Sequence, residues 1–307
     1  MSLLHATLPT GACDCHTHVV GDFARYPMVA DRHYTPGPAP HEALLDHMQR
    51  TGIQRTVIVQ PSFYGTDNRC MLESLLRLQG TGRGIAVVDR EVEAAILGSM
   101  HDAGVRGLRI NIESAGVRDA LALEEPLRYW AGRIADLGWH LQIYASHHTT
   151  ASMATALASL PVPVVLDHFA MVPAGVEAND PQLRQLLSLL ESGNVYLKLS
   201  APYRIAASDP VVCSTQLAHL FLRTNPQRML WGSDWPHTNR EAGKSAHQVS
   251  RYRDIPSETL VDSIQKWLPT LDLQKQVLFE TLPVEILFNP PNPISQRIVI
   301  NRGSNDG

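Results

Sequence analysis

Eight short apolar segments recur along the 307-residue chain. Each has the length of one strand, and their apolar character is nearly continuous, which is typical of strands covered on both faces. The sequence therefore predicts eight buried strands. They cover residues 11–19, 55–60, 83–89, 105–111, 139–145, 162–168, 195–200 and 228–234.

Amphipathic stretches separate these segments. In 181–193, for example, leucines recur at three- and four-residue spacing and the stretch ends at a glycine, as helices do. Alternating buried strands and helices favour a parallel sheet, and eight such units close into a (β/α)8 TIM barrel. A doubly wound open sheet is the alternative, but the glycine-rich nucleotide turn G-x-G-x-x-G does not occur in the chain.

The remaining segments are assigned around this barrel. Residues 1–290 are predicted to form one barrel domain, in which 235–262 is an extended loop over the barrel mouth and a helix near 271–287 closes the fold. Residues 291–307 are predicted to be a peripheral tail. Its QRIVI stretch could add an edge strand or contact another subunit, so the oligomeric state stays open.

Charge and composition narrow the partners. The net charge is −4 without a basic run, which argues against nucleic acid and anionic membranes but leaves room for a small anionic substrate. No apolar run reaches ~18 residues, and the first residues lack the pattern of a signal peptide. The four cysteines form no C-x-x-C pair, which predicts reduced thiols and a cytoplasmic protein.

Polar residues at the carboxyl ends of barrel strands are the candidates for chemistry, because active sites of such barrels form there. His16 and His18 stand two apart on the first predicted strand, so both should point to one face. Cys13 and Cys15 should then face away. Further candidates at strand ends are Ser62, Asp89, Arg109, Tyr144, His168, Lys198 or Ser200, and Asp234.

Two chemistries suit this set. His16, His18 and Asp234 could hold one divalent metal such as zinc, and His147 or His148 could join them. Alternatively, or in addition, Asp234 could act as a general base on a water molecule. Asp14 is predicted to orient the histidines from deeper on the same face, and His237 is interpreted as a loop residue.

The motifs also carry a family resemblance. DCHTHV, LDH and GSDWPH resemble the amidohydrolase superfamily, whose barrels hydrolyse esters, amides and lactones. A further resemblance, to the 2-pyrone-4,6-dicarboxylate lactonase group of aromatic catabolism, is carried by six motifs in order: VQPSFYGTDN, RGIAVVD, GVRGLRIN, IYAS, VPVVLDH and LWGSDWPHTN. Together the motifs span about residues 11 to 240, and six of them in order are far more specific than H-x-H alone.

The resemblance implies an amidohydrolase-type barrel that opens a carboxylated lactone. Asp234 would activate water, and His16, His18 and His168 would polarise the ring carbonyl. No metal would be required, which agrees with a tyrosine ending the fifth strand where metal-dependent relatives commonly carry histidine. Substrate contacts would come from Arg109, Arg204, Ser62, Tyr144 and Tyr34.

One departure concerns the second carboxylate of such a substrate. The group places a second arginine shortly after the fourth strand, where this chain has Ala115, with Arg118 slightly beyond. Each carboxylate removed from water needs donors, so an anchor for the second one is missing from the pattern. Alternative functions are a sugar-acid lactone isomerase, a metal-dependent decarboxylase, and a non-catalytic barrel that binds a small acid.

Overall fold

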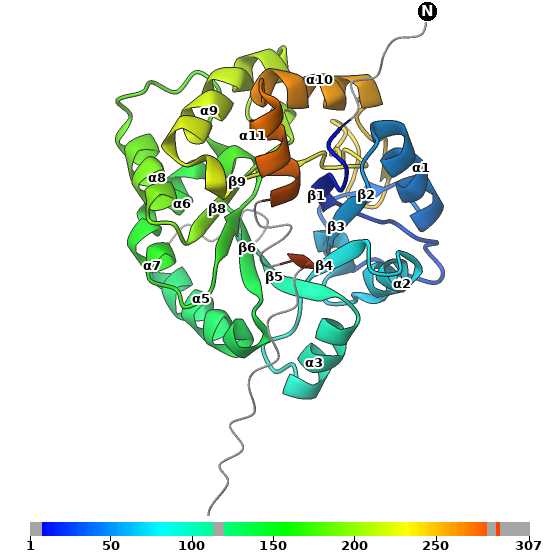
Figure 1. The fold of residues 1–307 in the computed structure, drawn as a ribbon. Coiled ribbons are helices and arrows are strands. Elements are labelled where there is room, and N and C mark those ends of the chain that lie inside the picture. Colours follow the sequence, from blue (N-terminus) through cyan, green and yellow to red (C-terminus); the bar gives the residue numbers. More distant parts are fainter. Residues whose placement is uncertain (1–7, 113–119, 281–286, 289–307) are drawn as a thin grey trace, which may run out of the picture.

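Eight parallel strands form the centre of the protein, as the computed structural model shows for the residues it describes, which are 8–112, 120–280 and 287–288 (Figure 1). Each strand pairs with the next in chain order, and no described strand of this sheet runs antiparallel to its neighbour. The strands are β1 (Cys13–Thr17), β3 (Arg55–Val59), β4 (Gly82–Ala86), β5 (Val105–Asn111), β6 (His140–Tyr144), β7 (Val164–Leu166), β8 (Val195–Ser200) and β9 (Met229–Gly232).

The sheet closes between its first and last strands. The amide of Asp234 donates to the carbonyl of His16 at 2.9 Å, and the amide of His18 donates to the carbonyl of Trp235 at 2.8 Å. These two bonds join the end of β1 to the segment after β9. The predicted eight-stranded (β/α)8 barrel is therefore confirmed, with every predicted strand in place.

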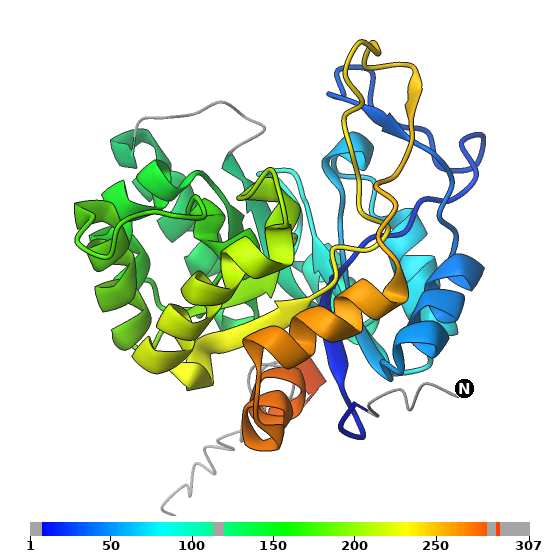
Figure 2. The ribbon, with the colours of Figure 1, turned by 90° about the horizontal axis from the view of Figure 1, so that it is seen from above.

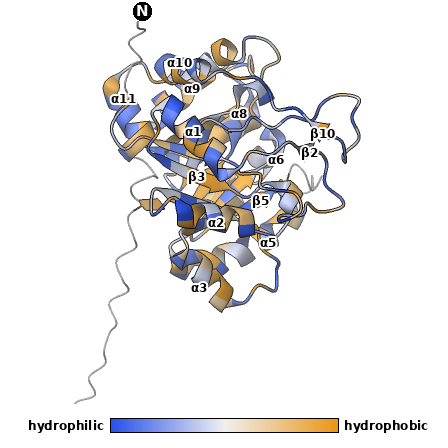
Figure 3. Cartoon of the chain, turned by 90° about the vertical axis from the view of Figure 1, so that its right-hand side faces the viewer, coloured by the Kyte–Doolittle hydropathy of each residue, from blue (hydrophilic) through white to orange (hydrophobic). Residues whose placement is uncertain are grey.

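Helices surround the barrel and cover its outer face (Figure 1). In α8, Leu183, Leu186 and Leu190 are buried, while polar residues on the opposite face meet water, and Asp180 caps the first turn by accepting from the amide of Leu183. Figure 3 shows apolar strands enclosed by helices that carry both hydrophobic and hydrophilic residues. The helices are α1 (His41–Thr51), α2 (Arg69–Arg77), α3 (Ala94–Asp102), α5 (Ala120–Ile134), α6 (His147–Ser152), α7 (Ala154–Ala158), α8 (Pro181–Glu191), α9 (Pro210–Thr224), α10 (Ser257–Trp267) and α11 (Leu271–Lys275).

The register of β1 contains an irregularity that matters for the site. Asp14 lies opposite Thr56 of β3, and Thr17 lies opposite Ile58. Three steps along β1 therefore match only two steps along β3, which is a β-bulge. A bulge breaks the alternation of side chains between the two faces of a strand.

The bulge changes which side chains of β1 face the barrel interior. Cys13 and Cys15 pack in the interior cluster of strand residues, and His16, the next residue, also faces inward. Asp14 instead lies toward α1, where its carboxylate is 3.3 Å from Nε2 of His47. The predictions that the cysteines face away from His16 and that Asp14 shares the histidine face are therefore wrong.

Two loops rise from the mouth of the barrel, and we call them the rim loops: residues 22–40 and 238–256. They stand side by side in Figure 2 and meet in a short parallel pair, β2 (Thr35–Pro36) with β10 (Val249–Ser250). The predicted loop 235–262 thus contains β10, and it ends earlier than expected because α10 begins at Ser257, directly after Pro256.

The end of the chain is described only in part. The predicted helix near 271–287 begins at Leu271 as α11 and continues as a π-helical turn, η6 (Gln276–Glu280). The predicted tail, 291–307, lies outside the described residues. Among the helices that the structure does describe, none combines the length and apolar character needed to cross a membrane.

Candidate active site

Asp234 stands at the centre of a buried cluster at the carboxyl ends of the strands. Its Oδ1 atom is 3.5 Å from Nε2 of His18, 3.6 Å from Nε2 of His16 and 3.9 Å from Nε2 of His168. Within the described residues, Oδ1 has no hydrogen-bond partner. We call these four residues the floor. The structure thus brings together all four residues predicted to be catalytic.

The other carboxylate oxygen of Asp234 is fully engaged. Oδ2 accepts from the Tyr203 hydroxyl at 2.6 Å and from two nitrogens of Arg204 at 2.8 and 3.2 Å. Burial alone would raise the pKa of Asp234, but the Arg204 guanidinium and the nearby imidazoles outweigh it and hold that pKa well below its usual range. Asp234 is therefore an ionised carboxylate with one occupied oxygen and one open oxygen.

The floor depends on unusual backbone. His168 and Asp234 both adopt left-handed conformations, with φ of 50° and 61°. Such a conformation costs a residue with a side chain about 1 kcal/mol or more, and it often marks a functional site. Gly232 lets the segment before Asp234 approach β1, because a Cβ there would lie 2.7 Å from the Cβ of His16.

The ring orientations of His18 and His168 are fixed by hydrogen bonds at Nδ1. Nδ1 of His18 is 2.7 Å from the carbonyl oxygen of Val59, which can only accept, so this nitrogen carries a proton. Nδ1 of His168 is 2.9 Å from Oγ of Ser200. Since that hydroxyl can donate, the proton of His168 can lie on Nε2, which faces Asp234.

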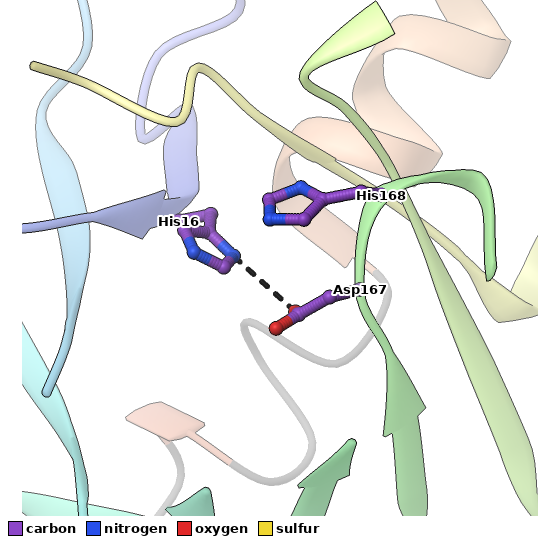
Figure 4. Close-up of side chains that lie close together, drawn as sticks. All are labelled: His16, Asp167 and His168. Carbon is purple, nitrogen blue, oxygen red and sulfur yellow. Dashed lines mark ion pairs between the residues drawn. The ribbon is translucent and has the colours of Figure 1, made fainter. Parts of the chain in front are cut away.

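His16 is held by an ion pair inside the barrel. Its Nδ1 atom is 3.2 Å from Nζ of Lys198 and 3.3 Å from Oδ1 of Asp167, and those two groups are 3.2 Å apart. Figure 4 shows His16 and His168 beside each other, with Asp167 reaching His16 from below. Burial and the Lys198 charge lower the pKa of His16 to about 3, so the ring is neutral.

Asp14 supports the floor from the helical layer. Its Oδ1 atom accepts from the amides of His16 and Ser233, at 3.1 and 2.9 Å. One carboxylate thereby fixes the backbone next to both His16 and Asp234. The predicted orienting role of Asp14 thus has a structural basis, although it acts through the backbone and from the opposite face of β1.

A cavity of about 380 Å³ lies directly above the floor. His18 and His168 form its base, whereas His16 and Asp234 lie beneath them, fully buried. Every residue predicted to contact substrate lines this cavity, and all five come from different segments of the chain. They are Ser62, Tyr34, Arg109, Tyr144 and Arg204.

Arg109 presents a cation to this cavity from β5. Its side chain is 8% exposed, and Nη1 donates to the carbonyl oxygen of Gln60 at 3.1 Å. Its Nε has no partner among the described residues. The guanidinium lies 5.9 Å from the ring of Tyr144, so an aromatic and a cationic group line the same wall.

Three other residues named in the sequence analysis lie apart from the floor. His147 lies 3.6 Å from Asp180, and His148 contacts Gln182 at 2.7 Å, so neither joins the histidine cluster. Asp89 accepts from Thr66 at 3.2 Å and does not line the cavity.

His237 is more than a loop residue. It is buried, and its amide donates to the carbonyl of Asp234 at 2.7 Å, so it closes the turn that presents the carboxylate. Ala115 and Arg118 lie outside the described residues.

Three contributors were not singled out from the sequence. Asp167 stands next to His168 in the LDH motif, and only the left-handed turn at His168 lets both face inward. Tyr203 lies in a short helical turn after β8, and Arg240 lines the cavity from a rim loop. Loop residues such as these carry no periodic signal.

The floor can be tested for its fit to a metal ion. Ligand atoms of His16, His18 and Asp234 lie within 4.8 Å of one another, and imidazole and carboxylate are ligands that zinc accepts. The charges fit poorly, because Arg204 already balances Asp234 and Lys198 already balances Asp167. A divalent ion would add two uncompensated charges to a dry site. The residues match a metal in donor type and spacing but not in charge.

The barrel, with histidines and an aspartate at its strand ends, defines a class. The amidohydrolase family model matches residues 13–264, so the chain belongs to the amidohydrolase family, as the motifs indicated. The fold is shared at lower identity as well. A protein from Acinetobacter baumannii, solved with citric acid bound, is 25% identical with a TM-score of 0.75, covering 91% of this chain and 99% of that one.

Curated relatives point to a narrower group within the family. A 2-pyrone-4,6-dicarboxylate hydrolase from Comamonas testosteroni is 34% identical over 285 residues, 89% of each chain. A 4-sulfomuconolactone hydrolase from Hydrogenophaga intermedia is 30% identical over 238 residues, 76% of this chain and 78% of the relative. Both relatives are hydrolases of lactones that carry acidic groups, and the predicted resemblance to the lactonase group is confirmed.

Proposed function

We propose that the protein is a hydrolase that opens a carboxylated lactone by attack of water on the ring carbonyl. One observation carries the proposal: the open oxygen of Asp234 lies beneath a cavity whose wall presents the buried guanidinium of Arg109. A base and an anion anchor thus serve one space. The two curated relatives and the neighbour with bound citric acid support the same class of substrate.

The first step is activation of water. Oδ1 of Asp234 is the only oxygen of that carboxylate free to accept a proton, because Tyr203 and Arg204 occupy Oδ2. Water that enters above His18 and His168 gives its proton to Oδ1 while its oxygen attacks the lactone carbonyl carbon. Arg204 and Tyr203 hold the carboxylate in place during this step, so the base needs no reorientation.

The second step places charge on the former carbonyl oxygen. Donors that are already oriented can stabilise this oxyanion without reorganising during the reaction. Nε2–H of His168 is such a donor when Ser200 donates to Nδ1. His18 can donate from Nε2 only as the protonated ring, because Nδ1 already gives its proton to Val59. The ring oxygen then leaves and recovers the proton held on Asp234.

The substrate needs a good leaving oxygen. The described residues of the site place no strong acid beside the ring oxygen that leaves. An oxygen that departs as an enolate therefore suits the site better than one that departs as an alkoxide. A pyrone provides this leaving group, because its ring oxygen is bonded to an alkene carbon, whereas in a muconolactone the oxygen leaves from a saturated carbon. We propose that the reaction needs no metal, because fixed cations already pair with Asp234 and with Asp167.

The test is a substrate panel run in ¹⁸O-labelled water. The purified protein, stripped of metal and checked by elemental analysis, is assayed on carboxylated pyrones, muconolactones and sugar-acid lactones. We expect ring opening of a pyrone or muconolactone with one labelled oxygen in the new carboxylate, at a rate unchanged by stripping.

Other results would contradict parts of this proposal. Rearranged product without label indicates an isomerase, and release of carbon dioxide indicates a decarboxylase. Activity that disappears on stripping and returns with one equivalent of zinc contradicts the metal-free mechanism but leaves the substrate class standing. A protein that opens no acidic lactone contradicts the function itself.

A further inference from the structure

We propose that Arg240 is a specificity-determining residue, which binds a second anionic group of the substrate at the outer end of the cavity. The inference rests on the proposed function, and it starts from a charge inventory. The cavity lining includes three arginines, Arg109, Arg204 and Arg240, and among the described residues it includes no carboxylate. The two uncommitted cations of the three define what the cavity can bind.

Arg204 is not one of these two. Its Nε and Nη2 atoms both donate to Oδ2 of Asp234, and Nη2 also lies 3.3 Å from Oγ1 of Thr238. An arginine used this way holds the base and has its charge balanced by it. Moving it to the substrate would leave the buried Asp234 carboxylate without its countercharge, which is costly.

Arg109 is the inner anchor. Among the described residues its charge faces no acid, and its one hydrogen bond to them goes to a backbone carbonyl, which is neutral. A buried guanidinium with an unpartnered Nε is stabilised by an anionic group that enters the cavity. One carboxylate of the substrate is therefore assigned to Arg109.

Arg240 is the outer anchor. It lines the same cavity from the rim loop 238–256, its side chain is exposed, and no ion pair or hydrogen bond joins it to any described residue. The neighbouring acid is not available to it. Glu241 is already paired with Lys244 at 2.7 Å and with Arg251 at 2.8 Å. The charge of Arg240 is left for a ligand.

The two anchors differ in depth, and this sets the shape of the ligand. A substrate with one acidic group near the reacting ring and a second at its outer end satisfies both guanidinium groups at once. A carboxylate and a sulfonate share the chemistry that Arg240 recognises, namely a compact oxyanion with several acceptor oxygens. The outer anchor also supplies the donors missing at Ala115 of the sequence pattern.

The experiment changes one residue of the protein and one group of the substrate, separately and together. Arg240→Gln and the wild type are assayed on a lactone with two acidic groups and on its analogue in which the outer group is a neutral amide. We expect the substitution to lower kcat/KM for the dianion about tenfold, mainly through KM, and to change the amide by less than about twofold. Dicarboxylated and sulfonated lactones form the two arms that identify the outer group.

Two further variants make the result specific. Arg240→Lys keeps the charge and should recover part of the loss, whereas Arg223→Gln, an exposed arginine on α9 away from the cavity, should match the wild type. Equal losses on the dianion and the amide, or no loss on either, would overturn the proposal. So would a dianion-specific loss found in Arg118→Gln and absent in Arg240→Gln.

A binding measurement separates this proposal from the proposed function. Calorimetry with benzene-1,3-dicarboxylate and with benzoate reports on the anchors without any turnover. Tighter binding of the diacid that is lost in Arg240→Gln supports the outer anchor even if no lactone is hydrolysed. If acidic lactones are hydrolysed but the diacid binds Arg240→Gln as tightly as the wild type, the proposed function holds and the role of Arg240 as outer anchor is contradicted.

Discussion

The floor and the rim loops meet at one cavity but are built in opposite ways. His16, His18, His168 and Asp234 are buried at the strand ends of the barrel, and a neighbouring group fixes Nδ1 of each histidine and Oδ2 of the aspartate. The rim loops stand above the barrel, are joined by a two-residue strand pair, and expose Arg240. This contrast assigns the chemical reaction to the buried floor and the selection of the substrate to the exposed rim loops.

The largest effect is expected from breaking the floor at its centre. Asp234→Asn keeps the size of the side chain but removes the proton acceptor, so kcat should fall about 10³-fold while diacid binding changes little. Steady-state kinetics and calorimetry on the same samples check this. Asp89→Asn, an exposed strand-end carboxylate outside the cavity, is the control. Loss of binding equal to the loss of rate would contradict a base.

Arg109 should give the next largest effect, because it belongs to the wall between the two regions. Arg109→Met keeps the length of the stem but removes a buried charge that meets the substrate, so kcat/KM should fall about 10²-fold. The matched control is Arg106→Met on the same strand, whose guanidinium donates to the carbonyls of His101 and Val105 instead. Similar kinetics for the two variants would contradict a role of Arg109 in substrate binding.

Two buried histidines outside the floor should make stability depend on pH. Burial and the Lys198 charge lower the pKa of His140 to about 3, and burial lowers that of His237 to about 4. The unfolded chain binds these protons near pH 6.5 and the native state does not, so stability is present above that pH and is lost as the pH falls. Each histidine contributes about 1.4 kcal/mol per pH unit in this window.

Urea unfolding at several pH values between 4 and 7 measures this slope. His140→Gln should reduce it by the contribution of one histidine, whereas replacement of His33, an exposed residue of the rim, should not. An unchanged slope in His140→Gln would show that this ring takes up its proton in the native state.

The smallest effect is expected at the rim. Tyr252 donates a hydrogen bond to the carbonyl of Gly37 and so ties one rim loop to the other. Tyr252→Phe should raise KM about threefold and leave kcat unchanged, because the floor is untouched. The control is Tyr129→Phe, whose hydroxyl donates to the carbonyl of Arg90 on the outside of the barrel. A fall in kcat would show that the two regions are not separable.

The sequence was informative where periodicity and position act together. Continuous apolar strands located the eight strand ends, and a barrel brings strand ends together whatever their distance in the chain. That is why residues as far apart as His16, Arg109 and Asp234 could be assigned to one site. The family resemblance added Tyr34 and Arg204, which stand in loops and turns that periodicity does not place.

The misses have a common physical cause. Alternation along a strand excludes Asp167 beside His168 and Cys15 beside His16, yet left-handed backbone in one case and a bulge in the other turn both neighbours inward. These local departures depend on tertiary packing, about which short-range sequence patterns carry no information. Arg240 was missed because an exposed arginine in a polar loop is unremarkable until the fold places it above a cavity.

The bulge in β1 has a practical consequence for protein engineering. A designer who moves H-x-H onto a regular strand of another barrel would place His16 and His18 on one face but would lose the orientation seen here. The segment that has to be transferred is Cys13–His18, including the extra residue of the bulge and the Asp14 carboxylate that binds the amide of His16. Conversely, deleting Cys15 should remove the bulge and restore regular alternation, with Asp14 toward the helices and both His16 and His18 still facing inward.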